Sequence, residues 1–495
     1  MRFYLAICGH SYFLFLLSTV MKKIIVKTAM ALLMLVCLGA PVCATADERS
    51  RVIVTTDGEA DDKASMVRFL LTCNEFDVEA IVNSSSEFHW QGGRGWNALQ
   101  PVDWVRDYIG LYAKVYANLK KHSPLYPEPD SLLARWRVGN VGGVGEDSAR
   151  TPGAELIARI LLDGSDPRPV WVQAWGGCNT LSRALRIIEE EHPDRMGEVA
   201  ARTRLFLIWE QDDTYQRYIR PHWEKFNITT IISDQFDCMA YIWPKVLPAD
   251  VKPYFEAPWM TANIIDGHGP LCAAYENKDG AFNGEGDTPA FLHSVPNGLR
   301  SMECPAYGGW GGRYEHVRAG VWMDIPPAGG YSHPDGKWGF SNSWSKMMER
   351  WTEPGRVAVR TAYFKPIWRW MKDVQNDFAA RADWCVADYA DANHHPVVRL
   401  AGTPADITAT PGQTVTLDAS ATTDPDGDRL AFRWWHYAEA GTYRGRAVEG
   451  GNEAKVSVVV PADARPGETI HFVCTVTDSG TPTLTRYARV VITVE

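Results

Sequence analysis

Between about residues 50 and 235, short β-rich runs alternate with segments that have the apolar spacing of helices. This alternation constrains the fold most strongly, because it is typical of parallel strands joined by crossover helices. Runs such as Val170-Trp171-Val172 are apolar at every position, as expected for strands that are covered on both faces. We therefore predict an α/β domain with a doubly wound, mainly parallel sheet. The expected strands are 51–56, 78–82, 169–174, 204–209 and 228–232, and the expected helices are 62–73, 102–119, 154–162 and 181–190.

The rest of the chain changes character twice. From about 265 to 345 it is rich in Gly, Pro, Trp and Tyr with weak periodicity, and a further helix is expected at 366–383. Beyond His394-His395-Pro396, period-two runs alternate with turn signals such as Pro411-Gly412. This pattern is typical of a small β-sandwich of immunoglobulin-like kind. We predict a first domain of residues 47–395 and a C-terminal sandwich of residues 396–495.

The first 46 residues have the pattern of an export signal. Lys22-Lys23 follow Met21, an apolar stretch covers 29–40, and Ala44-Thr45-Ala46 form a small-x-small cleavage site. We expect translation to start at Met21 and cleavage to follow Ala46, which predicts a secreted or periplasmic bacterial protein. No later run approaches about 18 uninterrupted apolar residues, so no membrane span is expected.

Charge and aromatic content narrow the class of partner. The chain has 50 basic and 60 acidic residues and no long basic run, so it lacks the electrostatic footprint of a protein that binds nucleic acid polymers. It also has 20 Trp. Large flat rings with a polar N–H suit stacking on sugar faces, and a tryptophan-rich core is the alternative explanation. A carbohydrate is the expected partner, and the sequence leaves the oligomeric state open.

The sharpest local signal is an acidic loop where the first expected strand meets the first expected helix. Asp57, Glu59, Asp61 and Asp62 fall within six residues. Ligands of open α/β sheets bind at the carboxyl ends of strands, and one Asp alone would suffice to cap the helix. Several carboxylates this close repel one another unless a cation neutralises them, and hard oxygen ligands suit Ca²⁺. The loop therefore predicts a calcium site.

This loop resembles the opening signature of the nucleoside-hydrolase superfamily, an aspartate-rich loop of the D-x-D-P-G-x-D-D type. The resemblance implies that Asp57 is both a calcium ligand and the general base that activates water. It also implies that Asp62 is a bidentate calcium ligand and that Asp61 contacts sugar hydroxyls. The match is partial, because the family's first aspartate falls on Thr55 and its Pro-Gly pair on Gly58-Glu59.

Two further segments resemble the same superfamily. Residues 171–181 look like its strand–Gly–loop–helix segment, which implies that the main-chain carbonyl of Asn179 reaches the metal. Residues 285–290 look like its His-Asp-Pro segment, which implies that Asp287 closes the calcium sphere and binds ribose-like hydroxyls. Gly286 stands where that segment often has His, so the imidazole that helps a nucleobase leave is missing.

A narrower resemblance is to secreted nucleoside-hydrolase-like proteins of polysaccharide-degrading bacteria, which are often labelled cellulose-binding and carry a β-sandwich tail. The segments 287–292 and 307–314 look like those of this group, and the resemblance covers nearly all of residues 50–495.

Residues near the ends of other strands are expected to bind the substrate. The glycine-rich segment 308–313 lacks the GK[ST] ending of a phosphate loop, so we interpret it as an aromatic lid or sugar platform. Asp212-Asp213 are explained equally well as a helix cap. The predicted substrate-binding residues are Asp61, Asn83, Glu87, His89, Glu210, Trp310 and Arg313.

Together these features predict a secreted, calcium-dependent hydrolase of a glycosidic bond in a pentose-like or cell-wall saccharide. Asp57 would accept a proton as water attacks an oxocarbenium-like anomeric carbon. Candidates for the general acid are Glu285, Glu303 and His268. The alternatives are a non-catalytic cellulose- or polysaccharide-binding protein and a nucleoside N-ribohydrolase.

Overall fold

The computed structural model describes residues 49–93, 102–324, 357–446 and 448–495. The predicted signal peptide and part of the aromatic-rich segment lie outside these residues. Arg49–Glu495 form one compact unit. In the described part of the chain, no helix combines the length and the apolar character that crossing a membrane requires.

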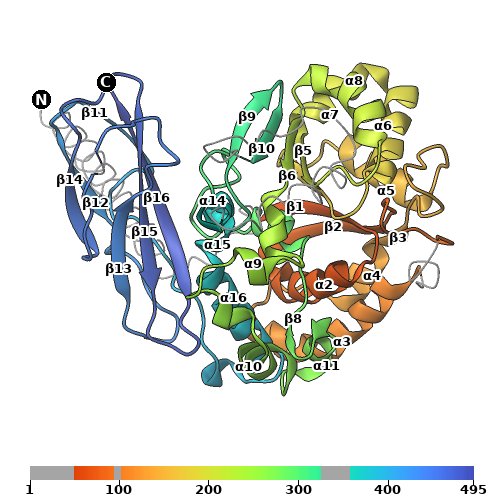
Figure 1. Cartoon of the computed structure of the whole chain (residues 1–495), viewed down its shortest axis with the longest axis horizontal. Coiled ribbons are helices and arrows are strands. Elements are labelled where there is room, and N and C mark those ends of the chain that lie inside the picture. The colour runs from red at the N-terminus through yellow and green to blue at the C-terminus, as the bar shows by residue number, and fades with distance from the viewer. Residues whose placement is uncertain (1–48, 94–101, 325–356, 447) are drawn as a thin grey trace, which may run out of the picture. The chain divides into compact units, whose positions relative to one another are not determined.

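An eight-stranded sheet organises the first part of this unit (Figure 1). Its strand order is β3-β2-β1-β4-β5-β6-β10-β9, and all neighbours are parallel except β10 and β9. The predicted doubly wound, mainly parallel sheet is therefore confirmed. The strands are β1 (Ser50–Thr56), β2 (Phe76–Asn83), β3 (Trp136–Val138), β4 (Val170–Ala174), β5 (Thr203–Ile208), β6 (Thr229–Ser233), β9 (Tyr314–Arg318) and β10 (Val321–Asp324).

Both faces of this sheet are covered, as the apolar strands predicted. Alternate residues of β1 enter two different cores, Val52 and Val54 on one face and Ile53 on the other. The first face packs against α2 (Ala60–Thr72), α3 (Trp104–His122) and α16 (Met371–Asp383). The second packs against α5 (Pro152–Leu162), α6 (Asn179–Glu191) and α7 (Met196–Arg202). The strand order reverses between β1 and β4, which places the expected ligand crevice at the carboxyl ends of these two strands.

The C-terminal part is a β-sandwich. A four-stranded sheet of order β11-β16-β15-β13 and a two-stranded sheet of β12 and β14 share one apolar core. This arrangement is compatible with the expected immunoglobulin-like kind. The strands are β11 (Asp406–Ala409), β12 (Thr414–Asp418), β13 (Ala431–His436), β14 (Lys455–Val459), β15 (Thr469–Thr477) and β16 (Thr485–Val494).

The sandwich contacts the α/β part through buried groups of β16. The Trp310 indole N–H donates to the Tyr487 hydroxyl at 3.2 Å. Arg489 donates to the carbonyl oxygens of Leu299 at 2.7 Å and Gly308 at 2.9 Å. These contacts run across the boundary expected at residues 395 and 396, which stays a prediction.

Several short elements were not predicted. The three residues of β3 and the β9–β10 pair lie at the sheet edges, where runs of three to five residues carry little periodicity. The helix expected at 366–383 is divided into α15 (Lys365–Trp368) and α16. Further short helices are α4 (Pro129–Arg135), α8 (Arg220–Trp223), α9 (Trp243–Val246), α10 (Ala257–Met260), α11 (Gly269–Ala273), α12 (Thr288–Leu292) and α14 (Val357–Tyr363).

Candidate active site

The acidic loop lies at the carboxyl end of β1, beside the point where the strand order reverses. β1 ends at Thr56 and α2 begins at Ala60, so the loop is only three residues long. Asp61 and Asp62 occupy the first turn of α2, where the helix dipole favours negative charge. The sequence thus delivers three aspartates to one sheet edge through a short, well-anchored turn.

Asp62 ties the strand end to the helix start. Its Oδ1 accepts hydrogen bonds from the Thr56 hydroxyl and from the Asp57 backbone N–H, the latter at 3.2 Å. The Asp57 carboxylate is buried, and its Oδ2 atom has no hydrogen-bond partner among the described residues. Gly176 lies directly opposite, because a Cβ atom there would come within 2.8 Å of the Asp57 Cβ and Cγ. Only a glycine leaves room for the Asp57 side chain.

Asp287 joins these aspartates from a distant part of the chain. One carboxylate oxygen from each of Asp61, Asp62 and Asp287 lies within 4.8 Å of the others, and all three residues are buried. Asp287 Oδ2 has no hydrogen-bond partner in the described part of the molecule. The Tyr241 hydroxyl donates to Asp61 Oδ1 at 3.0 Å. The loop and residue 287 thus meet through Asp61 and Asp62, whereas Asp57, which was predicted as a ligand, is not among these three carboxylates, and its role stays a prediction.

These carboxylates are buried, and no basic residue in the described part of the chain pairs with them. Burial first, and then the charges of Asp62 and Glu59, raise the pKa of Asp57 well above its ordinary value. Burial and the neighbouring Asp62 raise the pKa of Asp61 to about 7. The pKa of Asp287 is likewise raised by burial and by Asp62 and Asp61. A set of acids that repel one another in a dry pocket has the electrostatics of a cation site.

A cavity of about 210 Å³ opens beside the carboxylates. Its described lining combines acids with aromatic rings and contains no Lys, Arg or His. Such a pocket suits a neutral polyhydroxylated ligand, because aromatic faces can stack on it and carboxylates can accept its O–H groups. The lining residues are Glu59, Asp61, Asp62, Phe88, Trp175, Ile208, Trp209, Gln211, Phe236, Asp237, Ala240, Tyr241 and Asp287.

A buried ion pair joins α2 to the segment that carries Asp287. Arg68 donates to both carboxylate oxygens of Glu285, at 2.5 and 2.9 Å, and both side chains are at most 2% exposed. Tyr275 and Thr288 also donate to this carboxylate. Glu285 therefore positions the segment that carries Asp287, and it does not belong to the described lining of the cavity as the predicted general acid would.

The other two candidates for the general acid lie elsewhere. Glu303 is an exposed partner of Arg300, and His268 pairs with Asp383 at 3.1 Å. Neither belongs to the described lining of the cavity.

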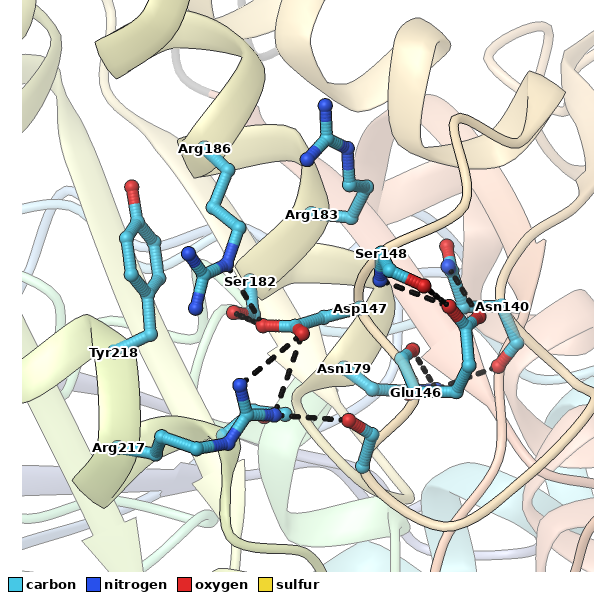
Figure 2. Close-up of polar contacts among 12 residues, drawn as sticks. Asn140, Glu146, Asp147, Ser148, Asn179, Ser182, Arg183, Arg186, Arg217 and Tyr218 are labelled. Atoms are coloured by element: carbon cyan, nitrogen blue, oxygen red, sulfur yellow. Dashed lines mark hydrogen bonds and ion pairs between the residues drawn. The ribbon is translucent and has the colours of Figure 1, made fainter.

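Asn179 lies at the start of α6, and the predicted role of its main-chain carbonyl as a metal ligand stays a prediction. Its side-chain amide donates to the carbonyl oxygens of Asn140 at 2.6 Å and Glu146 at 3.0 Å, which directs the side chain toward the loop before α5. Figure 2 shows this loop held beside Asn179. In the segment predicted to reach the metal, the residue that lines the cavity is Trp175, where β4 ends.

Asp147, in the same loop, is held by hydrogen bonds from three side chains. The Asp147 carboxylate accepts from Ser182 at 2.6 Å, Arg186 at 2.9 Å and Arg217 at 3.2 Å (Figure 2). Ser182 and Arg186 belong to α6, so the loop is fixed to the helix that follows β4. We assign this network a structural role, because Glu146 and Asp147 each accept hydrogen bonds from neighbouring donors.

The residues predicted after β2 divide into two roles. His89 Nδ1 lies 2.7 Å from the carbonyl oxygen of Asp57, so His89 supports the acidic loop from behind. The Asn83 side chain accepts a hydrogen bond from the Trp136 indole at 2.7 Å, which links β2 to the edge strand β3. Glu87 is half-buried, and its backbone N–H bonds to Gln211. Among these neighbours, Phe88 is the residue that lines the cavity.

The residues on either side of Glu210 line the cavity, and Glu210 itself does not belong to the described lining. Trp209 has a φ of 60°, which is uncommon for a bulky residue and marks a sharp turn after β5. From this turn Trp209 and Gln211 line the cavity, whereas Glu210 accepts from Gln216 at 2.6 Å. The strand pattern alone could not show this turn.

Trp310 and Arg313 lie at the junction with the sandwich and outside the cavity lining. Trp310 is fully buried against Tyr487, and Arg313 donates to the carbonyl oxygen of Glu439 at 2.8 Å. Their segment is glycine-rich because the chains pack closely: a Cβ atom on Gly311 would come within 2.4 Å of the Pro289 carbonyl oxygen. The aromatic lid predicted here is an internal packing surface.

Comparison with known proteins identifies the family. Residues 51–314 match the family described as cellulose-binding Sde182, nucleoside hydrolase-like domain. The chain belongs to this family. Residues 414–494 match the C-terminal domain of the cellulose-binding protein Sde0182, which confirms the predicted pairing of the two parts.

A solved structure supports the same family over nearly the whole chain. It is a nucleoside hydrolase-related hypothetical protein from Saccharophagus degradans that is associated with carbohydrate metabolism. It is 31% identical with a TM-score of 0.70, and the match covers 90% of this chain and 100% of that chain.

More distant structures carry no functional argument. A plant nucleoside hydrolase and an inosine-guanosine nucleoside hydrolase are 12% and 11% identical, with TM-scores of 0.28 and 0.30. Those matches cover 64% and 65% of this chain and 98% and 99% of the other chains. The comparison with curated proteins found no match.

Proposed function

We propose that the protein is a secreted, calcium-dependent hydrolase of a glycosidic bond in a pentose-like or cell-wall saccharide. One observation carries the proposal: carboxylates from two distant segments meet with no basic partner among the described residues, on a cavity that is also lined by aromatic side chains. Family membership makes a nucleoside-hydrolase-like reaction possible but does not establish it, because one fold hosts many activities. Secretion rests on the leader pattern alone.

The donor set fits calcium. Asp57, Asp61, Asp62 and Asp287 offer hard carboxylate oxygens, which Ca²⁺ prefers. Asp57 Oδ2 and Asp287 Oδ2 are buried with no partner among the described residues, an expensive arrangement unless something positive binds them. Bound there, the ion would lower the pKa of a water molecule and orient vicinal hydroxyls.

The chain's own residues supply the other parts of the reaction. The Asp57 carboxylate accepts the proton of the attacking water, because one of its oxygens is not engaged by the described protein. Trp175 and Trp209 offer aromatic faces to the sugar ring. The absence of Lys, Arg and His from the described lining favours a neutral sugar over a phosphorylated or uronic acid one.

A second candidate function is non-catalytic binding of a polysaccharide. The family descriptions for both parts of the chain contain the words cellulose-binding, which favours this reading. In that case the carboxylates and aromatic walls would hold a sugar without cutting it.

Product release with and without a calcium chelator separates the candidates. The probes are arabino-, xylo- and cello-oligosaccharides and a panel of nucleosides. We expect sugar release from an oligosaccharide that stops when the chelator is added and is absent in Asp57→Asn. Release from nucleosides alone would indicate an N-ribohydrolase. Pull-down on insoluble cellulose without any product would leave only the binding function.

A further inference from the structure

The proposed reaction needs a proton for the departing oxygen, and the predicted donors lie elsewhere. Apart from the acids that converge on the cation site, the described lining of the cavity offers three groups that carry an acidic proton, Glu59, Asp237 and Tyr241. Glu59 belongs to the acidic loop itself and is half-buried. The Tyr241 hydroxyl already donates a hydrogen bond to Asp61. Asp237 remains.

We propose that Asp237 is the general acid that protonates the leaving-group oxygen, a role that rests on the proposed function. Asp237 lines the cavity from the loop after β6, so it comes from a different strand end than the aspartates of the cation site. It is 4% exposed, and its Oδ2 atom has no hydrogen-bond partner in the described part of the chain. No described side chain thus competes for that oxygen.

The loop that carries Asp237 is held rigidly. Asp324 Oδ2, at the end of β10, accepts the backbone N–H groups of Asp234 and Gln235. Asp234 in turn accepts from the Trp209 indole at 2.7 Å and from the Tyr363 hydroxyl at 2.5 Å. A catalytic group must be held close to its productive geometry by such supporting contacts. The same contacts fix Trp209, which lines the cavity beside Asp237.

The surroundings of Asp237 favour the protonated form of its carboxyl group. Burial, and then the nearby Asp234 and Asp61, raise the pKa of Asp237 well above its ordinary value. The first two causes do not involve the carboxylates of the cation site. A raised pKa favours the neutral form of the carboxyl group, which has a proton to give, as a general acid requires.

The step balances with two carboxyl groups. A bond forms between the water oxygen and the anomeric carbon while the bond from that carbon to the leaving oxygen breaks. Asp57 accepts a proton from the water, and Asp237 gives its proton to the leaving oxygen. Asp57 ends neutral and Asp237 ends ionised, and exchange with solvent restores both. The net reaction consumes one water molecule.

Leaving-group dependence tests this role. The probes are 4-nitrophenyl and phenyl glycosides of β-D-ribofuranose, α-L-arabinofuranose and β-D-xylopyranose. A nitrophenolate leaves without a proton, whereas a phenolate needs one. In Asp237→Asn we expect turnover of the phenyl glycoside to fall about 10²- to 10⁴-fold and that of the nitrophenyl glycoside to fall less than about tenfold. The high-pH limb of the wild-type rate profile should disappear in the variant.

A matched control is Asp250→Asn, because Asp250 is an exposed aspartate paired with Lys372. It should leave both rates unchanged. Equal losses on both glycosides in Asp237→Asn, or no loss on either, would overturn the role. Circular dichroism checks the fold of the variant, and Asp237→Ser replaces it if Asn does not fold. A steep leaving-group dependence in the wild type would also exclude an internal acid. If the wild type cleaves none of the probes, oligosaccharides or nucleosides, the proposed function fails and Asp237 loses its role with it.

Discussion

Two groups of buried acids in this protein differ in their partners. At the candidate site, Asp57, Asp61 and Asp287 are each close to other carboxylates, and the pKa of each is raised. Beneath α16, burial would also raise the pKa of Asp377, but Arg381 and His395 outweigh it and hold that pKa well below its ordinary value. Burial acts on the acids of both groups, but among the described residues only the group around Asp377 contains an arginine that offsets it.

The paired group joins parts of the chain that are far apart in sequence. Arg381 donates to Asp377 at 2.8 Å and to Glu75 at 2.6 Å, and Arg486 of β16 lies 3.4 Å from Asp377. These contacts connect the turn that follows α2 with α16 and the sandwich. A satisfied network of this kind holds structure together, whereas an unsatisfied one stores free energy that a ligand can release. The comparison predicts that mutations in the two groups will have opposite effects on activity and stability.

The largest effect is expected on turnover in the cavity. Asp57→Asn should lower the turnover number about 10²- to 10⁴-fold, since the variant cannot accept the water proton. Its melting temperature without calcium should stay equal or rise, because one repelling buried charge is removed. Steady-state kinetics on the most active oligosaccharide and a thermal melt measure both. A variant that turns over at the wild-type rate would contradict the role of Asp57.

The next effect is expected on stability in the paired group. Arg381→Met should lower the free energy of unfolding by about 3–5 kcal/mol, because it leaves Asp377 and Glu75 buried without their main partner. Urea unfolding followed by tryptophan fluorescence measures it. Lys120→Met is the matched control: Lys120 pairs with Glu128 at the surface and should show no measurable change. Wild-type stability in Arg381→Met would remove the distinction between the two groups.

Calcium should stabilise the molecule through the cavity acids alone. At a calcium concentration about 100 times the dissociation constant, binding to the folded state adds about 2.7 kcal/mol. Melts with calcium and with a chelator should differ in the wild type and in Arg381→Met. They should coincide in Asp62→Asn, which removes a charge from the site. An equal calcium shift in Asp62→Asn would place the ion elsewhere.

The smallest effect is expected from acid. The pKa values of Glu75 and Asp377 are lower in the folded protein than in the unfolded chain, so the unfolded chain binds these protons more readily. Their contribution to stability is complete above about pH 5 and is lost as the pH falls below about 4, at about 1.4 kcal/mol for each unit of lowering. Urea midpoints between these pH values, with calcium present, should fall less in Arg381→Met. Parallel slopes for both proteins would assign the acid sensitivity to other groups.

Local patterns in the chain were enough to predict much of the architecture and the first half of the site. The strands β1, β2, β4, β5 and β6 follow from apolar runs, because a strand covered on both faces must be apolar at nearly every position. The acidic loop could be located because it follows such a strand directly. The short strands β3, β9 and β10 were missed because runs of three to five residues carry little periodicity.

The cavity residues that the sequence did not reveal also have a physical reason. Trp209, beside the predicted Glu210, and Trp175, four residues before the predicted Asn179, belong to the described lining of the cavity. Which of two neighbouring residues points inward at a strand end depends on one backbone turn, and the φ of 60° at Trp209 leaves no local pattern. Asp237 and Tyr241 were missed for a related reason, since they lie in a segment of short helices with weak periodicity.

The sequence by itself determined the layered α/β architecture, the sandwich and the cluster of acids after the first strand, because these depend on residues close together in the chain. The tertiary structure decided which distant groups complete the site. It places Asp287 beside Asp61 and Asp62, pairs Glu285 with Arg68, and buries Trp310 at the junction with the sandwich. Whether a buried acid is repelled or paired depends on what the fold places within a few ångströms of it, and no local pattern contains that distance.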